Sequence, residues 1–433
     1  MLASTGPVAD PADPSATLWQ ATAPAAPKLA ALDGNAETDV LVIGGGIAGL
    51  STALHLAERG VDVLLVEAAQ LGSGATGQSG GLIAPDYIRH SPASIGHALG
   101  NNEAGERMTR LVGEAAQRCF DLIAHHGIDC DARQDGFYTP VHTHRLAAAQ
   151  RDTAEQWRAR GFDVSVIDGA ETQRRLGSRA YCGALRFGQG GWLNPLAYAR
   201  GLARAAVTAG ARIHVETPVA DLARIGDRWH ARTPAGLIGA RRIVLAANGG
   251  NAGLHPAMRH AALPLHVYEF ATAPLVPDLR ARVLPEGGAF TDKSPYIFSA
   301  RYDGAGRLIS AFPKTFVVRG AQARRNEAKR RLVRYFKGFE TVEIESVWEG
   351  VAWINASFLP EIYDLGDGAL AIQACNGRGI SLNSAIGVEL AGALATNDLG
   401  TMSVQPRKPK PFPFFRAAAR LPKAMMTLAY LSD

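Results

Sequence analysis

The sequence of 433 residues has only four cysteines, and it has neither a CxxC pair nor a group of histidines at metal-binding spacing. A disulfide framework requires closely spaced cysteines in a short secreted chain, and a zinc site requires paired ligands. Cys119, Cys130, Cys182 and Cys375 lie far apart. These absences argue against a disulfide scaffold and predict reduced thiols and no metal site.

The sequence also lacks a long apolar segment and a strong net charge. No apolar run approaches the roughly 18 residues that span a bilayer. Residues 1–39 are rich in Ala and Pro and contain Asp10 and Asp13, unlike a secretory signal. With 45 basic and 40 acidic residues the net charge is +5, which does not indicate nucleic-acid binding. We expect a cytoplasmic protein with no transmembrane segment and no nucleic-acid partner; the oligomeric state stays open.

Glycine, in contrast, is abundant, with 47 residues. The most informative glycines follow Asp39–Ile43, a short apolar run that predicts a buried parallel strand. Gly44, Gly46 and Gly49 form a GxGxxG fingerprint there, and helix-forming residues follow over Leu50–Arg59. In such a fingerprint the glycines allow a tight turn, close approach to a pyrophosphate and close helix packing.

A second strand completes the pattern of a dinucleotide-binding unit. Val61–Val66 is again short and apolar, and it ends at Glu67, 23 residues after the first glycine. An acid near this spacing accepts the ribose hydroxyls of a dinucleotide. Strand, glycine turn, helix, second strand and acid together predict that this unit binds a dinucleotide.

Three further segments favour a flavin dinucleotide. Leu71–Gly81 is glycine-rich and is suited to lie along a long ligand, although a flexible linker is the alternative. Arg241–Gly250 is a strand that runs into small residues, and Gly368–Ser381 is a strand and a glycine turn before a helix over Leu382–Ala395. The N-terminus of that helix would stabilise negative charge on a flavin ring. A turn used only for packing is the alternative.

The chain resembles the D-amino-acid-oxidase superfamily of FAD oxidoreductases, and within it the gamma-glutamylputrescine-oxidase-like branch. The resemblance covers most of the chain. It is carried by Thr17–Ala23, Asp39–Glu67, Gly72–Gly81, His266–Leu275, Asp303–Leu308, Trp348–Gly350, Leu359–Glu361 and Asn376–Ile380.

The resemblance implies an α/β fold, in which a Rossmann-like FAD-binding domain of the glutathione-reductase type is interleaved with a substrate domain built on a mainly antiparallel sheet. The expected division is an N-terminal extension (1–37), a discontinuous FAD-binding domain (38–129, 176–260 and 340–402), a substrate domain (130–175 and 261–339) and a basic, Pro- and aromatic-rich C-terminal tail (403–433).

The resemblance also implies the residues that contact FAD. They are Gly44, Gly45, Gly46, Ile47, Ala48, Gly49, Glu67, Ala68, Gly74, Ala75, Thr76, Gln78, Ser79, Gly80, Gly81, Leu82, Val219, Ala246, Ala247, Asn248, Gly249, Gly377, Arg378, Gly379, Ile380 and Ser381. Gln78 stands where relatives with histidyl-linked flavin carry His, so non-covalent FAD is expected. The segment Pro295–Ser299 has Ser299 where relatives have an arginine, with Arg301 nearby, so the usual substrate is not implied.

The implied reaction is oxidation of an amine or amino acid by hydride transfer from the C–H next to nitrogen to flavin N5, with reoxidation by O₂ or by another electron acceptor. The expected pocket residues are Arg378, Tyr268, His266 and Tyr296. A structural role is the alternative for Arg378, and ordinary packing is the alternative for the other three. Trp348 and Trp353 are expected to be core residues, with a substrate cage as the alternative. His125 and His126 are expected to be a solvated pair at a helix end.

Three other classes compete with this interpretation. A flavin monooxygenase would carry a Gly-Asp motif after a late strand, but Gly366-Asp367 precedes the strand Ala369–Ala374 and predicts a turn. A reductase with two dinucleotides would need a second fingerprint, and Asn248–Gly253 lacks its first glycine. The third class, a non-catalytic FAD protein, stays open. Within the enzyme interpretation, a dehydrogenase with a quinone or protein acceptor also stays open.

The tail carries the whole net charge. It holds one acid, Asp433, and the six bases Arg407, Lys408, Lys410, Arg416, Arg420 and Lys423, so residues 1–402 are formally neutral with 39 bases and 39 acids. Prolines interrupt the tail and leave only a short helix near Ala424–Leu431. We expect an extension that wraps the body, with membrane or partner binding as the alternative.

Overall fold

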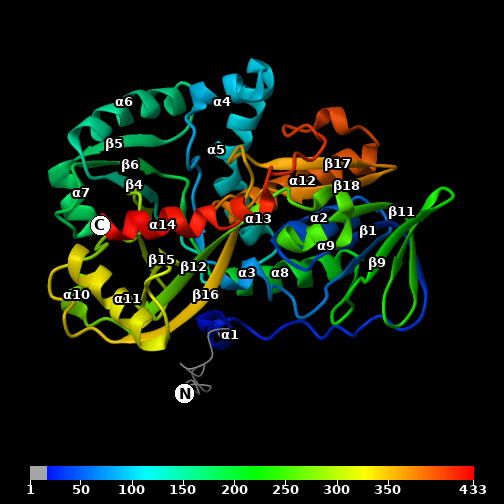
Figure 1. Ribbon diagram of the computed structural model, residues 1–433, viewed down its shortest axis with the longest axis horizontal. Coiled ribbons are helices and arrows are strands. Elements are labelled where there is room, and N and C mark those ends of the chain that lie inside the picture. The colour runs from blue at the N-terminus through cyan, green and yellow to red at the C-terminus, as the bar shows by residue number, and fades with distance from the viewer. Residues whose placement is uncertain (1–16) are drawn as a thin grey trace.

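The computed structural model describes residues 17–433, so most of the predicted N-terminal extension lies outside the described residues. Two eight-stranded sheets organise this part of the chain, one on each side of the long central helix α5 (Figure 1). The strands of each sheet come from segments far apart in the sequence, as the α/β prediction with interleaved domains requires.

The first sheet has the strand order β17-β18-β11-β1-β2-β8, and the hairpin β9–β10 pairs with β11. Strands β8, β2, β1, β11 and β18 run parallel to their neighbours, whereas β17 is antiparallel. The strands are β1 (Ala36–Ile43), β2 (Val63–Val66), β8 (Arg212–His214), β9 (Asp221–Ile225), β10 (Arg228–Arg232), β11 (Leu237–Leu245), β17 (Glu361–Gly366) and β18 (Ala369–Gln373).

Alternating side chains bury both faces of this sheet. Val40 and Val42 of β1 pack toward the helices, whereas Leu41 and Ile43 pack toward the β9–β10 side, where Trp229 lies. The helices whose side chains share the first of these cores are α2 (Ile47–Ala57), α5 (Asn102–His125), α8 (Pro195–Thr208) and α12 (Gly379–Thr396). The predicted strand–helix–strand unit is therefore present, with β1, α2 and β2 in the expected order.

The second sheet is mainly antiparallel, with the order β16-β12-β15-β14-β13-β4-β6-β5. Only β13 and β4 pair in parallel. Its strands are β4 (Phe137–Val141), β5 (Val164–Asp168), β6 (Gly183–Phe187), β12 (Leu263–Thr272), β13 (Ala289–Thr291), β14 (Ser299–Tyr302), β15 (Leu308–Pro313) and β16 (Ile344–Ile354). The helices α6 (His144–Arg158), α7 (Gly169–Leu176), α10 (Pro277–Arg280) and α11 (Ala321–Tyr335) lie on this side of the molecule (Figure 1).

Two strands lie in a different sheet from the one that the predicted boundaries suggest. Residues 176–260 and 340–402 were assigned to the FAD-binding domain, but β6 pairs with β4 and β5, and β16 pairs along its length with β12. Most side chains of β16 alternate between buried and half-buried, which suits a strand with one face on a core. The rest of the domain division stays a prediction.

The remaining elements connect and cover the two sheets. They are α1 (Leu18–Thr22), α3 (Ala75–Gln78), α4 (Pro92–Leu99), α9 (Asn251–Leu254), α13 (Phe415–Ala418), α14 (Leu421–Leu431) and the strand pair β3 (Leu82–Ile83) and β7 (Gly191–Trp192). The tail lies on the body, because Arg407 bridges to Tyr363 of β17 and the Phe412 amide donates to the His260 carbonyl at 2.8 Å. Over residues 17–433, no helix has the length and apolar composition to cross a membrane.

Candidate flavin site and active site

The carboxyl ends of the parallel strands carry the predicted dinucleotide turn. Gly44 directly follows β1 and has φ +121°, and a Cβ there would lie 2.7 Å from the Ala246 carbonyl carbon after β11. A Cβ at Gly49 would lie 2.0 Å from the Gly44 carbonyl oxygen. Chain order reverses at β1, between β2 and β11, and ligands bind at such a switch point in α/β sheets. The glycines therefore fit the close backbone approach that a dinucleotide needs.

Glu67 lies at the same edge, where β2 ends. Its carboxylate accepts hydrogen bonds from the Gly45 amide at 2.7 Å and from the Ala69 amide at 2.9 Å. Each carboxylate oxygen has a further lone pair, so the fixed carboxylate can still accept ribose hydroxyls. Val219, the predicted contact from the neighbouring segment, is half-buried against the core on this side of the sheet.

The second glycine-rich segment is held in place, so it is not a free linker. The Gly72 amide donates to the Gly45 carbonyl at 3.0 Å, and the Ile47 amide donates to Thr76 Oγ1 at 3.3 Å. Trp348, which is fully buried, donates from Nε1 to the Gln78 carbonyl at 3.0 Å. Trp348 is thus a core residue, as predicted, and it fixes this segment.

Two helix N-termini reach the predicted flavin path without a capping side chain. The N-cap residue of α2 is Gly46, and that of α12 is Arg378. Before α12 the chain turns through Asn376 and Gly377, which have φ +39° and +78°. Uncapped helix N-termini attract phosphate and other negative charge. These residues fit a bound dinucleotide: α2 would hold its pyrophosphate, and the turn at 376–381 would face a ring system.

The segment after β11 borders a cavity of about 280 Å³. Asn248 and Gly249 line it together with Trp353, and Phe415 of the tail lies on it, stacked on His260 with ring centroids 4.3 Å apart. A Cβ at Gly249 would lie 2.0 Å from the indole of Trp353. The tail therefore supplies part of the wall of a cavity beside a predicted FAD contact.

Arg378 is anchored at the N-terminus of α12. Its Nε donates to Asp86 at 2.9 Å, its guanidinium lies 5.1 Å from the ring centre of Phe137, and its side chain is 9% exposed. Lys293 also pairs with Asp86, at 3.3 Å. Over residues 17–433, the two Nη groups of Arg378 have no hydrogen-bond partner within the protein. Asp86 and Lys293 were missed from the sequence because they are far from Arg378 along the chain.

The other three predicted pocket residues are not joined to Arg378 by any hydrogen bond or ion pair of the described chain. His266 and Tyr268 share β12, and His266 Nδ1 lies 3.2 Å from Glu349, which also binds Lys314. Tyr268 is buried, with Arg324 over its ring at 4.9 Å.

Tyr296 lies in the core of the second sheet. Its hydroxyl donates to the Pro313 carbonyl at 3.1 Å, and Arg331 lies over its ring at 4.5 Å. Burial raises its pKa above the usual tyrosine range. These contacts match the core-packing alternative for Tyr296.

The sequence did not single out a buried acid beside the glycine loop. Glu269 of β12 is 8% exposed, and its carboxylate lies against Gly80, where a Cβ would be 2.8 Å from Oε2. Burial raises the pKa of Glu269 to about 8, although the attraction of Arg301 partly opposes this. A carboxyl group that is protonated near neutral pH therefore lies against a predicted FAD contact.

Arg301, near the position where relatives carry an arginine, is a structural residue. It is 1% exposed and donates to the carbonyls of Gly80, Tyr302 and Leu193 at 2.8, 2.8 and 3.1 Å. Its guanidinium lies between the rings of Trp19 and Trp192, 4.8 and 5.0 Å from their centres. Burial lowers its pKa to about 10. Three of its five N–H groups donate to backbone carbonyls and the side chain is buried, so Arg301 serves the packing of the two sheets.

The structure argues against the two competing enzyme classes, the flavin monooxygenase and the reductase with two dinucleotides. Gly366-Asp367 forms the turn of the β17–β18 hairpin, with φ +92° and +50°. Asn248–Gly253 runs through a 3₁₀ turn into the four-residue helix α9, which is no counterpart of α2. Within the described residues, the chain therefore has one dinucleotide fingerprint and no monooxygenase motif.

Fold and site together define a flavoprotein-type, dinucleotide-binding α/β protein with a second, mainly antiparallel sheet. A family model described as FAD dependent oxidoreductase (DAO) matches residues 39–393. The chain belongs to this family, so the predicted resemblance is confirmed, and FAD is its cofactor.

Individual relatives agree with this assignment. The chain is 28% identical over 400 residues to gamma-glutamylputrescine oxidoreductase of Escherichia coli, covering 91% of this chain and 92% of that protein. The fold is similar to that of glycine oxidase from Geobacillus kaustophilus, with TM-score 0.70 and 21% identity over 84% of this chain and 95% of the other. It is equally similar to L-proline dehydrogenase from P. horikoshii, with TM-score 0.71 and 17% identity over 85% and 95%.

Proposed function

We propose that this FAD-dependent oxidoreductase oxidises an amine or amino acid and passes the electrons to O₂. The names of its relatives include an oxidoreductase of gamma-glutamylputrescine, an oxidase of glycine and a dehydrogenase of proline, and all three substrates carry an amine next to a C–H bond. When bound, FAD supplies a hydride acceptor for that bond. The imine that leaves hydrolyses to a carbonyl compound and an amine.

The observation that supports this proposal is the orientation of the Arg378 side chain. Asp86 holds its Nε, so the guanidinium is oriented, while its two Nη groups remain available to a ligand. A planar guanidinium binds a carboxylate through two parallel hydrogen bonds. We assign to Arg378 the binding of a substrate carboxylate or another acceptor group, and to Phe137 the apolar support beneath it.

Burial of the substrate in an apolar site favours the neutral form of its amine. Aliphatic amines have a pKa near ~10.4, and an apolar site lowers it because the charged form loses solvation. A neutral amine keeps the lone pair that assists loss of hydride, so no general base is required. Gln78 provides no covalent attachment, and we expect FAD to be released intact on denaturation.

The test is an anaerobic titration of the FAD-loaded protein with a panel of amines and amino acids. We expect one member to bleach the flavin absorbance, and Arg378→Gln to weaken its binding roughly tenfold or more, the value of a charged hydrogen bond. Arg145→Gln, on exposed α6, is the matched control. If no member bleaches the flavin, the enzyme does not oxidise these compounds.

The electron acceptor separates an oxidase from a dehydrogenase. We expect hydrogen peroxide to form during turnover in air. Turnover only with an added quinone or dye would assign the chain to the dehydrogenases instead, and a protein that no substrate reduces would be a non-catalytic FAD protein.

A further inference from the structure

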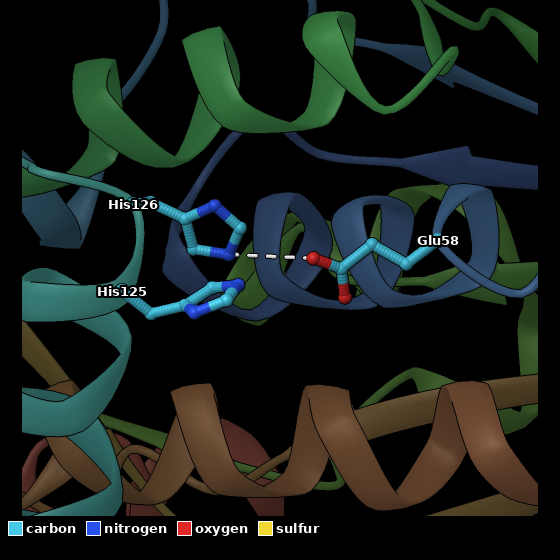
Figure 2. Close-up of side chains that lie close together, drawn as sticks. All are labelled: Glu58, His125 and His126. Atoms are coloured by element: carbon cyan, nitrogen blue, oxygen red, sulfur yellow. Dashed lines mark ion pairs between the residues drawn. The ribbon is translucent and has the colours of Figure 1, made fainter.

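Outside the flavin site, three potential ligands meet where two helices end. Figure 2 shows His125 and His126, at the end of α5, pointing toward Glu58, the residue after α2, with a dashed line from His126 to Glu58. One ligand atom from each residue lies within 4.8 Å of the other two, and His126 Nε2 is 3.3 Å from Glu58 Oε1. The proposed oxidation uses none of these residues.

The backbone at the end of α5 explains why two adjacent histidines face the same way. Successive helical residues point about 100° apart, so neighbours normally diverge. His125 is the last helical residue, but His126 has φ −94° and ψ 4°, and Gly127 turns the chain with φ +57°. As a result, the two rings lie at 85° with centroids 4.6 Å apart.

One ring nitrogen of the histidine pair is available to a ligand. Over residues 17–433, His126 Nε2 is buried and has no hydrogen-bond partner. An unpartnered, buried imidazole nitrogen that faces a carboxylate is unsatisfied as the protein stands.

A third histidine lies behind the carboxylate. His55 is 7% exposed, and its Nδ1 donates to the Ser51 carbonyl at 2.7 Å, since a carbonyl oxygen can only accept. Its Nε2 therefore carries a lone pair in the neutral ring, so it makes no hydrogen bond to Glu58 Oε2, which lies 4.0 Å away. A cation bound beside Glu58 would relieve the repulsion between these two acceptor atoms.

The surroundings suit a cation of moderate size. The cluster lines a cavity of about 390 Å³, whose α12 wall consists of Ser384, Ala385 and Val388 and carries no charge. The carbonyl ends of α2 and α5 both point here, and such ends favour positive charge. Of the nearby basic groups, Arg118 is paired with Glu114 at 2.6 Å, and Arg59 donates to the His55 carbonyl. Asp121 adds a second acid.

We propose that Glu58, His125 and His126 bind a divalent transition-metal ion of the Zn²⁺ type. Two imidazoles and a carboxylate are ligands that Zn²⁺ prefers, and a water molecule would complete the tetrahedron. Ligand atoms around Zn²⁺ lie roughly 3.3–3.5 Å apart, so ligand atoms now within 4.8 Å of one another need to approach by about 1.5 Å at most. The ion joins the C-terminal ends of α2 and α5 and acts on stability, not on the oxidation.

The test uses tag-free, FAD-loaded protein that has been treated with EDTA and desalted. Titration with ZnCl₂ in a calorimeter is expected to give one saturable site per chain, and Co²⁺ is expected to give the intense visible absorption of a tetrahedral site. Zn²⁺ should also raise the unfolding temperature, because it binds only the folded state. No saturable binding would overturn the proposal.

Substitutions of the proposed ligands test where the ion binds. His126→Ala and Glu58→Gln are each expected to lower Zn²⁺ affinity roughly tenfold or more, and His125→Ala combined with His126→Ala to abolish it. His144→Ala, exposed at the start of α6, is the control and should bind as the parent does. The flavin absorbance of each variant, measured in EDTA, reports folding independently of metal binding. Undiminished binding in the double variant would place the ion elsewhere and refute the site.

Discussion

The protonation of Glu269 makes a quantitative prediction about pH and stability. The carboxyl group is buried beside the glycine loop, and its pKa is raised to about 8 from 4.5. The folded protein therefore holds a proton that the unfolded chain releases between these values. The stability that this proton contributes is complete below pH 4.5 and is lost as the pH rises toward 8. Glu269→Gln keeps the shape of the protonated acid and removes the titration.

The magnitude follows from the shift. Each pKa unit corresponds to about 1.4 kcal/mol, so the parent protein should lose up to about 5 kcal/mol relative to the Gln variant between pH 4.5 and 8. Arg301 contributes nothing to this slope, because its pKa of about 10 keeps it charged throughout this range. For a chain of this length, a difference of that size changes the unfolding temperature by on the order of 5 °C.

The assay is thermal unfolding of the FAD-loaded protein at pH 5, 6.5 and 8.5, followed by the fluorescence of released flavin. We expect the parent and Glu269→Gln to unfold together at pH 5 and the variant to be the more stable protein at pH 8.5. Glu340→Gln, at an exposed position, is the control and should follow the parent at every pH. A constant difference between parent and variant across the range would refute the burial argument.

The other predictions concern the glycine turn and the tail. Gly49→Ala should abolish FAD binding, because the added Cβ would collide with the Gly44 carbonyl. Gly253→Ala is the control and should retain FAD, because no atom lies within 4 Å of its added Cβ. The absorbance of the purified proteins at the flavin bands measures the bound FAD. Deletion of residues 403–433 should lower the unfolding temperature, because His260 would lose its stacking contact with Phe415. If the full-length protein bound anionic vesicles and the deletion variant did not, a purely structural role of the tail would be contradicted.

The sequence predicted the dinucleotide unit well because its signals are local. A turn such as Gly44–Gly49 owes its shape to neighbours within a few residues, and the acid at Glu67 follows directly from the next strand. Helix α12 and the turn before it were predicted for the same reason. The predicted hairpin turn at Gly366-Asp367 also depended only on adjacent residues.

The partners of the site residues depend on tertiary structure and left no local signal. Arg378 meets Asp86 from a segment nearly 300 residues away, and Glu269 meets Gly80 only because the second sheet packs against the glycine loop. His125 and His126 looked like a solvated pair because Glu58 comes from another helix. Periodicity assigns a residue to a face of its own element, but it does not say which element covers that face.

The basic charge of the tail has a structural use that the composition alone did not reveal. Arg407 pairs with Glu361, and Lys408 lies 3.0 Å from Asp364, so two of the six tail bases face acids of β17. At the other end Asp433, the single acid of the tail, lies within 3.4 Å of Arg330, Arg331 and Arg334 on α11. The two ends of the tail thus meet charges of opposite sign, on β17 of the first sheet and on helix α11 beside the second sheet. If the tail lay in the opposite direction, like charges would meet at both ends and repel, so the charge distribution fixes the direction of the tail across the body. A segment that only bound membranes would need basic charge but not this division into a basic end and an acidic end.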